Sequence, residues 1–236
     1  GSEMCIRDSN VGTGINNYIY RNGLMYLQSD GKLVMMGNFT TYSGSTANRI
    51  VRINTDGTLD NTFNTGAGFS AGSSEGQILQ QSDGKLIIAA SLQNYSGSAI
   101  GHIVRLNTNG TIDTTFGTGS KFNGSNVAAA IQSDGKIIVG GYFTGYDTVA
   151  QNRLIRLNTD GTVDTTFNVG AGLNNTPSSI TVQSDGKVLV SGYFTTYSGS
   201  TVQNLIRINT NGTLDQTFVP PYSTVGSYPI LGISIV

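Results

Sequence analysis

The chain has 236 residues, with 13 basic and 14 acidic side chains and a formal net charge of −1. This balance gives no indication of nucleic acid or an anionic membrane surface as a partner. No apolar run approaches the roughly 20 residues of a membrane-spanning helix, so no membrane insertion is predicted. Only 11% of the residues are charged, and Ser, Thr, Asn and 32 Gly supply the polarity, a composition typical of many turns joined by β-strands.

The first nine residues, GSEMCIRDS, match nothing that follows, and residues 1–9 are predicted to be a non-native leader. The segment MCIRDS resembles the translation of a transposase end sequence used in making sequencing libraries. If the leader is foreign, the natural N-terminus is missing and the lack of a signal peptide carries no meaning. The single cysteine, Cys5, lies here and cannot form an internal disulfide, so the redox compartment stays undetermined.

After the leader the chain is an array of repeats. QSDGK begins at residues 28, 81, 132 and 183, and NTDGT or NTNGT begins at residues 54, 107, 158 and 209. Self-similarity at this period indicates supersecondary units that bury their faces against neighbouring units. We therefore expect four complete units at residues 10–68, 69–119, 120–170 and 171–221, and the first strand of a truncated fifth unit at residues 222–236.

Each unit predicts four antiparallel strands joined by two hairpins. In the first unit the first strand ends at Gln28, the second is LVMMGNF, the third is RIVRIN and the fourth passes through TLDNTF. Asp-Gly and Asn-Gly between apolar runs indicate tight hairpins, and we expect type I′ turns, whose two central residues both have positive φ. The first turn of each unit is centred on Asp30-Gly31, Asp83-Gly84, Asp134-Gly135 and Asp185-Gly186.

Four antiparallel strands in a repeated unit of this length predict the blade of a β-propeller, so the fold class is all-β. Dense turns and the lack of a 3.6-residue pattern exclude helical repeats, while a β-helix stays open as an alternative. Because propellers typically close with about 4 to 8 blades, four blades plus one strand predict an incomplete ring. Such a ring would leave two blade faces uncovered, which predicts self-association through them.

The strings QSDGKIIVGGYF and RLIRLNTDGTVDTTFN resemble the delta-60 repeat, a β-propeller domain of unknown function. The resemblance covers roughly residues 16–236. Trp-Asp and kelch repeats normally use tryptophan, and this chain has none. The resemblance implies an architecture, and the family has no general activity to carry over.

Catalysis and metal binding find little support. The only histidine, His102, takes the position of Arg49, Arg153 and Asn204 in the other units, which favours a polar residue at a strand end. With no second histidine and no credible cysteine, the usual nucleophile arrangements lack a supporting motif, so we predict no enzyme and no cofactor. The paired carboxylates of residues 56–60 and 160–164 lack the pattern of a calcium loop, so we predict no metal site.

Residues that recur in every unit are predicted to be structural. The aspartates of the fourth strand are expected to form ion pairs or hydrogen bonds with arginines, within a blade or between blades. These aspartates are Asp60, Asp113, Asp164 and Asp215, and the arginines are Arg52, Arg105, Arg156 and Arg207. The phenylalanines that close each unit are expected in the core: Phe63, Phe116, Phe167 and Phe218.

The side of the blades opposite the hairpin turns varies in sequence, as expected of loops displayed on a rigid scaffold. Its loops repeat a tyrosine that is our candidate ligand-binding residue, for a surface protein or a glycan. The four positions are Tyr42, Tyr95, Tyr146 and Tyr197. The alternative is a tyrosine that wedges between blades.

These observations favour a non-enzymatic scaffold for recognition or adhesion within a larger extracellular, cell-surface or virion protein. The first alternative is a structural spacer whose activity lies in flanking domains. A hydrolase or lyase that uses the propeller channel is the third.

Overall fold

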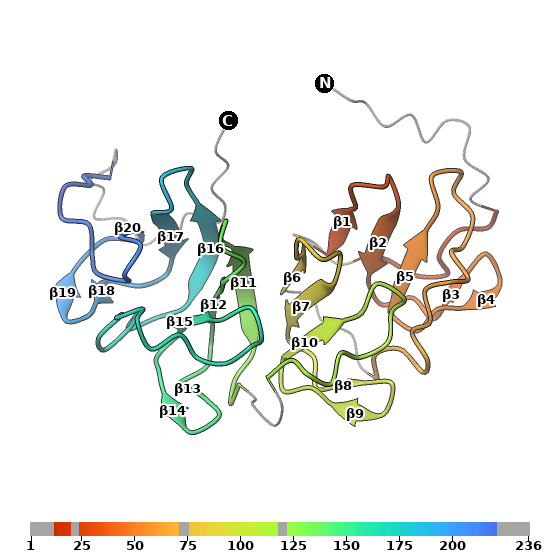
Figure 1. Cartoon of the computed structure of the whole chain (residues 1–236), viewed down its shortest axis with the longest axis horizontal. Helices are drawn as coiled ribbons and strands as arrows, with labels where there is room; N and C mark the ends of the chain where they lie inside the picture. The colour runs from red at the N-terminus through yellow and green to blue at the C-terminus, as the bar shows by residue number, and fades with distance from the viewer. Residues whose placement is uncertain (1–11, 20–23, 71–75, 118–121, 221–236) are drawn as a thin grey trace.

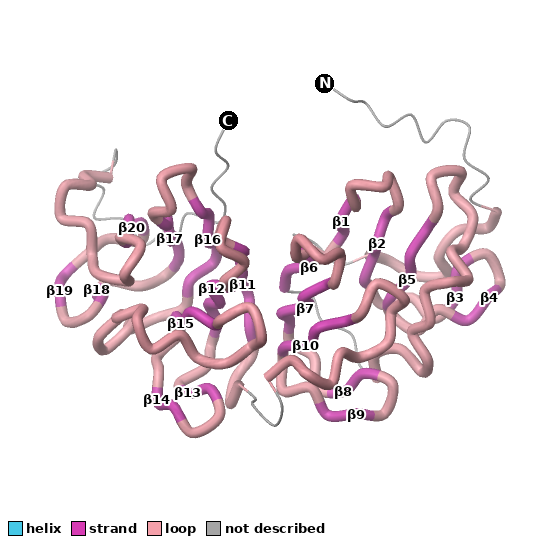
Figure 2. Tube along the Cα trace, in the orientation of Figure 1, coloured by secondary structure: helices cyan, strands magenta, loops and turns pink. Residues whose placement is uncertain are grey.

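The computed structural model describes residues 12–19, 24–70, 76–117 and 122–220. The predicted leader and the predicted strand of a fifth unit lie outside these residues. The described part of the chain consists of strands, turns and bends and contains no helix (Figure 2). The prediction of an all-β fold is therefore confirmed.

Each predicted unit contains one three-stranded antiparallel sheet. The first strands are β1 (Met25–Leu27), β6 (Gly76–Gln80), β11 (Asn126–Ile131) and β16 (Pro177–Val182). The second strands are β2 (Leu33–Met36), β7 (Leu86–Ala90), β12 (Ile137–Gly141) and β17 (Val188–Gly192). The third strands are β5 (Ile50–Ile53), β10 (Ile103–Leu106), β15 (Leu154–Leu157) and β20 (Leu205–Ile208).

The second strand is the middle of each sheet. In the second unit, β7 pairs with β6 on one edge and with β10 on the other. All five residues of β7 are buried, and so are all five of β12. A strand with ladder partners on both edges and neighbours on both faces has no solvent side, which explains its continuous apolar sequence.

A short hairpin, absent from our sequence prediction, follows each second strand. Its two strands are β3 (Thr41–Tyr42) and β4 (Ser45–Thr46), β8 (Asn94–Tyr95) and β9 (Ser98–Ala99), β13 (Gly145–Tyr146) and β14 (Val149–Ala150), and β18 (Thr196–Tyr197) and β19 (Ser200–Thr201). The two-residue strands are too short for a pattern of alternation to reveal them.

The hairpin turns are where predicted, but the predicted turn type is wrong. In the first turn only Gly31 has positive φ, at 81°, and Asp30 does not. The amide of Gly31 bonds to the carbonyl of Gln28 at 2.9 Å, and the amide of Gln28 bonds to the carbonyl of Lys32 at 2.8 Å. These bonds define a three-residue loop that ends in a left-handed glycine. The Asp30 carboxylate accepts a bond from the Lys32 amide at 3.1 Å, which holds the loop without a second positive φ.

The predicted fourth strand is reduced to one bridge in each unit. In the first unit Leu59 bridges to Ile53, and the amide of Asp60 bonds to the carbonyl of Arg52 at 2.9 Å. The chain then turns, because the amide of Phe63 bonds back to the carbonyl of Asp60 at 3.1 Å. The Asp60 carboxylate also accepts a bond from the Thr62 amide at 2.9 Å, and this turn ends the ladder that the apolar pattern predicts to continue.

The four sheets are arranged around a common centre as an unclosed ring of propeller blades (Figure 1). The first strands lie toward the centre and the short hairpins lie at the outside. Blades 1 to 4 follow one another along the chain, and the ring is open between blade 1 and blade 4.

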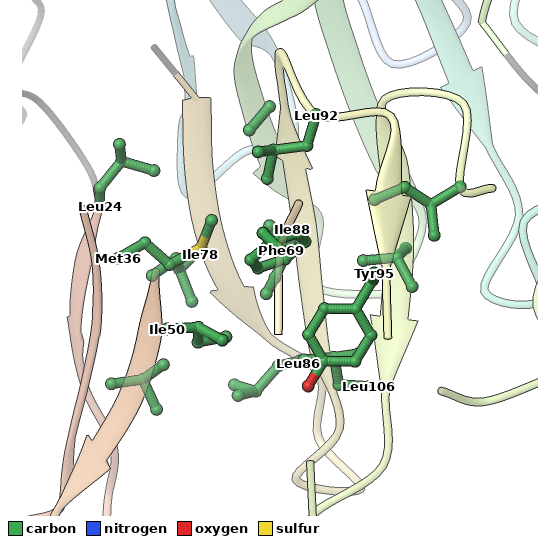
Figure 3. Packing of buried hydrophobic residues seen from close by; sticks show 14 of the residues in the cluster. Leu24, Met36, Ile50, Phe69, Ile78, Leu86, Ile88, Leu92, Tyr95 and Leu106 are labelled. Atoms are coloured by element: carbon green, nitrogen blue, oxygen red, sulfur yellow. The ribbon is translucent and has the colours of Figure 1, made fainter. Parts of the chain in front are cut away.

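The core lies between consecutive blades. One cluster combines Met36 and Ile50 of blade 1 with Ile78 and Ile88 of blade 2 (Figure 3). Two further clusters join blade 2 to blade 3 and blade 3 to blade 4 in the same way. Each sheet is therefore stabilised by its neighbours, as in other repeat architectures.

Candidate functional site

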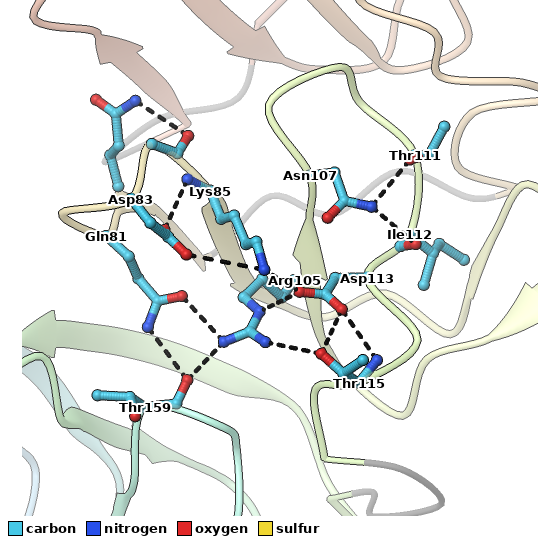
Figure 4. A network of polar contacts seen from close by, with 12 residues as sticks. Gln81, Asp83, Lys85, Arg105, Asn107, Thr111, Ile112, Asp113, Thr115 and Thr159 are labelled. Carbon is cyan, nitrogen blue, oxygen red and sulfur yellow. Dashed lines mark hydrogen bonds and ion pairs between the residues drawn. The ribbon is translucent and has the colours of Figure 1, made fainter.

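The most regular polar feature is a charged cluster at the end of each sheet (Figure 4). In blade 2, one oxygen of Asp113 accepts bonds from Arg105 Nε at 2.9 Å and Lys85 Nζ at 2.8 Å. The other oxygen accepts the amide and the hydroxyl of Thr115, at 2.9 and 2.6 Å. The predicted aspartate–arginine pairing is confirmed, and the lysine of QSDGK is a further member that was not predicted.

The same cluster recurs around Asp60, Asp164 and Asp215. Burial by itself would raise the pKa of Asp113, but the hydrogen bonds from Lys85 and Thr115 outweigh it and hold the pKa well below its usual range. The carboxylate is therefore charged at neutral pH, and its acceptor positions are occupied. A group in this state is unsuited to accept a proton from a substrate.

The arginine of each cluster also reaches the next blade. Arg105 Nη1 donates to the carbonyl of Thr159 in blade 3 at 2.6 Å and to Gln81 Oε1 at 3.3 Å. The equivalent bonds from Arg52 to Thr108 and from Arg156 to Thr210 measure 2.7 and 2.6 Å. The network therefore holds one blade together and joins it to the next.

The predicted core phenylalanines stack on these arginines. The guanidinium carbon of Arg105 lies 4.9 Å from the centre of the Phe116 ring, and that of Arg156 lies 4.3 Å from the Phe167 ring. Phe63, Phe116 and Phe167 are buried, whereas Phe218 in blade 4 is partly exposed. The ring faces therefore shield the buried arginine heads from water.

The four candidate tyrosines lie in the core. They are 1–2% exposed. Each hydroxyl donates to the glycine carbonyl of the NTDGT or NTNGT turn of its own blade at 2.5–2.7 Å. The acceptors are Gly57, Gly110, Gly161 and Gly212. Burial raises the pKa of Tyr95 and Tyr197. Such closed surroundings favour a structural role and argue against a ligand surface built from these rings.

The isolated histidine is at a strand end. His102 directly precedes β10, has a φ of 70°, and its backbone amide donates to the carbonyl of Leu92 at 2.9 Å. Burial lowers the pKa of its imidazole. Arg49 and Arg153, at the equivalent position, adopt the same left-handed conformation.

The paired carboxylates do not converge. Asp56 Oδ1 accepts the amide and the hydroxyl of Thr58 at 2.9 and 2.7 Å, while Asp60 bonds to Lys32 and Arg52. Across the described ranges, no three His, Cys, Asp or Glu side chains are grouped as a metal site would require. Within the same ranges no helix is long and apolar enough to span a membrane.

Two further tyrosines do reach solvent on the side of the variable connections. Tyr142 is 55% exposed and Tyr193 is 49% exposed, in neighbouring blades. Their amides donate to the carbonyls of Ser125 and Thr176, at 2.8 and 2.9 Å, directly before β11 and β16 begin. They therefore lie at the end of the sheet opposite the QSDGK turn.

A third exposed tyrosine, Tyr18, lies at the same end of blade 1, since its carbonyl accepts the amide of Asn38 at 3.0 Å. Asn38 and Ser91 hold the positions of Tyr142 and Tyr193 in blades 1 and 2. We call Tyr18, Tyr142 and Tyr193 the aromatic rim. The rim was not predicted, because the GYF segments continue the apolar pattern of the second strand. The signal in the sequence is a polar residue at this position in two units and a tyrosine in the other two.

The architecture defines a β-propeller, and solved structures support this class. Virginiamycin B lyase from Staphylococcus aureus matches with a TM-score of 0.51 and 17% identity, over 88% of this chain and 59% of the lyase. The chain therefore spans less than two thirds of that protein. At this identity the likeness shows the fold alone.

Two other structures match with lower scores. The extracellular domain of a one-component system protein from B. thetaiotaomicron has a TM-score of 0.49 and 16% identity, over 90% of this chain and 23% of that one. PorZ, a surface component of the type-IX secretion system of Porphyromonas gingivalis, has a TM-score of 0.45 and 11% identity, over 91% and 28%. No curated protein matches the sequence.

The chain belongs to the family described as "Domain of unknown function (DUF5122) beta-propeller". The family matches residues 28–63, 81–116, 132–167 and 183–218, one stretch in each unit. Each match begins at the glutamine of QSDGK and ends at the phenylalanine that closes the unit. The predicted propeller domain of unknown function is thus confirmed.

Proposed function

We propose that the chain is a non-enzymatic recognition scaffold of the delta-60 repeat type, which binds a glycan or a protein through its aromatic rim. It serves recognition or adhesion within a larger extracellular, cell-surface or virion protein. The observation that carries the proposal is the exposure of Tyr142 and Tyr193 at equivalent positions of adjacent blades.

Exposed tyrosines at such positions suit a ligand with apolar and polar faces. A tyrosine ring offers a large rigid surface and a hydroxyl that can donate and accept hydrogen bonds. Asn38 and Ser91 at the matching positions of the other blades add amide and hydroxyl groups. The low charge of the chain favours a neutral sugar or an uncharged peptide segment over an ionic ligand.

The charged clusters support a scaffold rather than a catalyst. Their carboxylates are saturated by lysine, arginine and threonine and hold the blades together. A scaffold needs this rigidity, because binding residues act best when the structure below them is fixed. The alternatives are a structural spacer and a hydrolase or lyase that uses the channel, and the binding experiment separates the first of these from recognition.

The test measures binding of the parent chain and of the double variant Tyr142→Ala/Tyr193→Ala. The two probes are a printed glycan array and a displayed peptide library. We expect the double variant to lose binding by about 10-fold to 100-fold, the loss typical of removing two central aromatic contacts. The matched control is Val149→Ala, an exposed apolar side chain on the outer hairpin of blade 3.

Three results are informative. Loss of binding in the double variant alone, with an unchanged circular dichroism spectrum, supports the rim as the site. Binding that survives in the double variant contradicts the rim. Absence of binding by the parent chain to both probes contradicts the recognition proposal and favours the spacer.

A further inference from the structure

Each blade has one face toward the next blade in the chain. In blade 4 this face differs from the equivalent face of blades 1 to 3. In β5, β10 and β15 all four residues are buried, whereas β20 alternates between partly exposed and buried residues. Its partly exposed residues are Leu205 and Arg207. The matching residues Ile50, Ile103 and Leu154 are 1%, 4% and 0% exposed, because the next blade covers them.

The polar contacts of this face are also incomplete. Arg207 keeps the bonds within its blade, to Asp215 at 2.7 Å and to Thr217 at 3.4 Å. Its Nη1 makes no bond to any described residue like the bonds that join Arg52, Arg105 and Arg156 to the next blade. Its side chain is 22% exposed, against 7–8% for the other three.

This face is hollowed. A cleft of about 390 Å³ is lined by the third strand of blade 4 and by the segment that follows it, including Leu205, Arg207, Leu214 and Phe218. We call these four residues the C-terminal face. Its surface is mostly apolar, and it carries one arginine Nη1 that has no partner among the described residues. The contacts between consecutive blades have the same chemistry.

At the opposite end of the ring, blade 1 has an apolar residue that is exposed where the equivalent residues of the other blades are buried. Met25 is 56% exposed, whereas the equivalent residues Ile78, Ala129 and Ile180 are 2%, 5% and 8% exposed. Ile78 belongs to the cluster that joins blade 1 to blade 2. Blade 1 also carries NTDGT at residues 54–58, the same string as at residues 158–162, where the carbonyl of Thr159 accepts the bond from Arg105. We call Met25 and Thr55 the N-terminal face.

We infer that the C-terminal face of one chain binds the N-terminal face of a second copy, as blade n binds blade n+1 within the chain. Arg207 donates to the Thr55 carbonyl of the second copy, and Leu205 is covered by its first blade. The contact joins two different surfaces, so it is heterologous, and it either closes a ring of copies or extends a row of them.

The test uses sedimentation velocity on the full chain over about a 100-fold range of concentration. The parent chain is expected to form complexes larger than a monomer as concentration rises. Leu205→Asp places a carboxylate in the C-terminal face, and Met25→Asp places one in the N-terminal face. Each variant alone is expected to weaken association by at least about 100-fold, because an unpaired charge would be buried.

The decisive sample is a mixture of the two variants. Each retains the face that the other has lost, so a heterologous contact predicts one 1:1 complex in the mixture. Val149→Asp on the outer hairpin is the matched control and should associate like the parent. Thermal melts of the isolated variants should match one another, since both substitutions lie at exposed or partly exposed sites.

Three results would overturn the inference: a parent chain that is monomeric throughout, variants that still associate, or a mixture that forms no complex.

Discussion

Each blade holds a carboxylate at which burial and hydrogen bonding have opposite effects. Asp113 is 6% exposed, yet lysine, arginine and threonine supply enough bonds to keep it charged. The sequence could predict the pairing with arginine, because both residues recur at a constant spacing. The sequence could not predict the bond from Arg105 to the carbonyl of Thr159 in the next blade. The acceptor is a backbone group, which every residue has, so no residue type indicates it.

Replacing Asp113 with Asn should lower the free energy of unfolding by about 3 kcal/mol at neutral pH, because Arg105 and Lys85 lose their counter-charge. The folded-state pKa of Asp113 is lowered, so its contribution is fully present above the unfolded pKa of about 3.9 and is lost as pH falls below that value. Urea denaturation at several pH values should show the difference between parent and variant shrinking below about pH 4.

Asp83→Asn is the matched control, since this side chain in the same blade is 52% exposed. We expect it to change stability by less than about 0.5 kcal/mol. A difference between parent and Asp113→Asn that is as large at acid pH as at neutral pH would contradict the charge argument.

At the scale of elements, the sequence predicts the number, order and pairing of the three long strands, because apolar runs and Asp-Gly or Asn-Gly turns mark them directly. The predicted turn type is wrong, and the fourth strand is shorter than predicted, for a common reason. In both places an aspartate side chain bonds to a backbone amide two residues later, as Asp30 does to Lys32 and Asp60 does to Thr62. Such local bonds compete with the ladder, and hydrophobic pattern does not report them.

Substitutions at two glycines distinguish the cost of backbone strain from the cost of a clash between blades. Gly97 and Gly110 have φ values of 82° and 85°, so alanine is strained at either position. An added Cβ at Gly97 would meet nothing within 4 Å, whereas at Gly110 it would lie 3.0 Å from the backbone oxygen of Asn64 in blade 1. The amide of Asn64 also bonds to the carbonyl of Asn109 at 2.6 Å.

We expect Gly97→Ala to cost about 1–2 kcal/mol from backbone strain alone. Gly110→Ala should cost at least about 1 kcal/mol more, because the blades must move apart. Chemical denaturation of both variants measures the difference. Equal losses of stability would show that the NTNGT turn, which contains Gly110, does not depend on the neighbouring blade.

At the scale of the whole molecule, the period and strand pattern of the repeats predict a propeller, and four blades plus one strand predict an open ring. The aromatic rim could not be predicted from the sequence. A tyrosine that recurs in every unit is a better candidate for a ligand-binding residue than a tyrosine present in only two blades. The structure reverses that order: the recurring tyrosines are 1–2% exposed and the others are about half exposed. Recurrence in every unit therefore indicates packing, and variation between units indicates surface.

The central feature of the molecule is an open ring in which each blade buries the arginine of the blade before it. Phenylglyoxal labelling of the Met25→Asp chain, followed by mass spectrometry, tests this directly, because that variant leaves the C-terminal face intact and uncovered. We predict that Arg207 reacts several-fold faster than Arg52, Arg105 and Arg156, in line with its greater exposure. Equal protection of all four arginines would contradict an open ring.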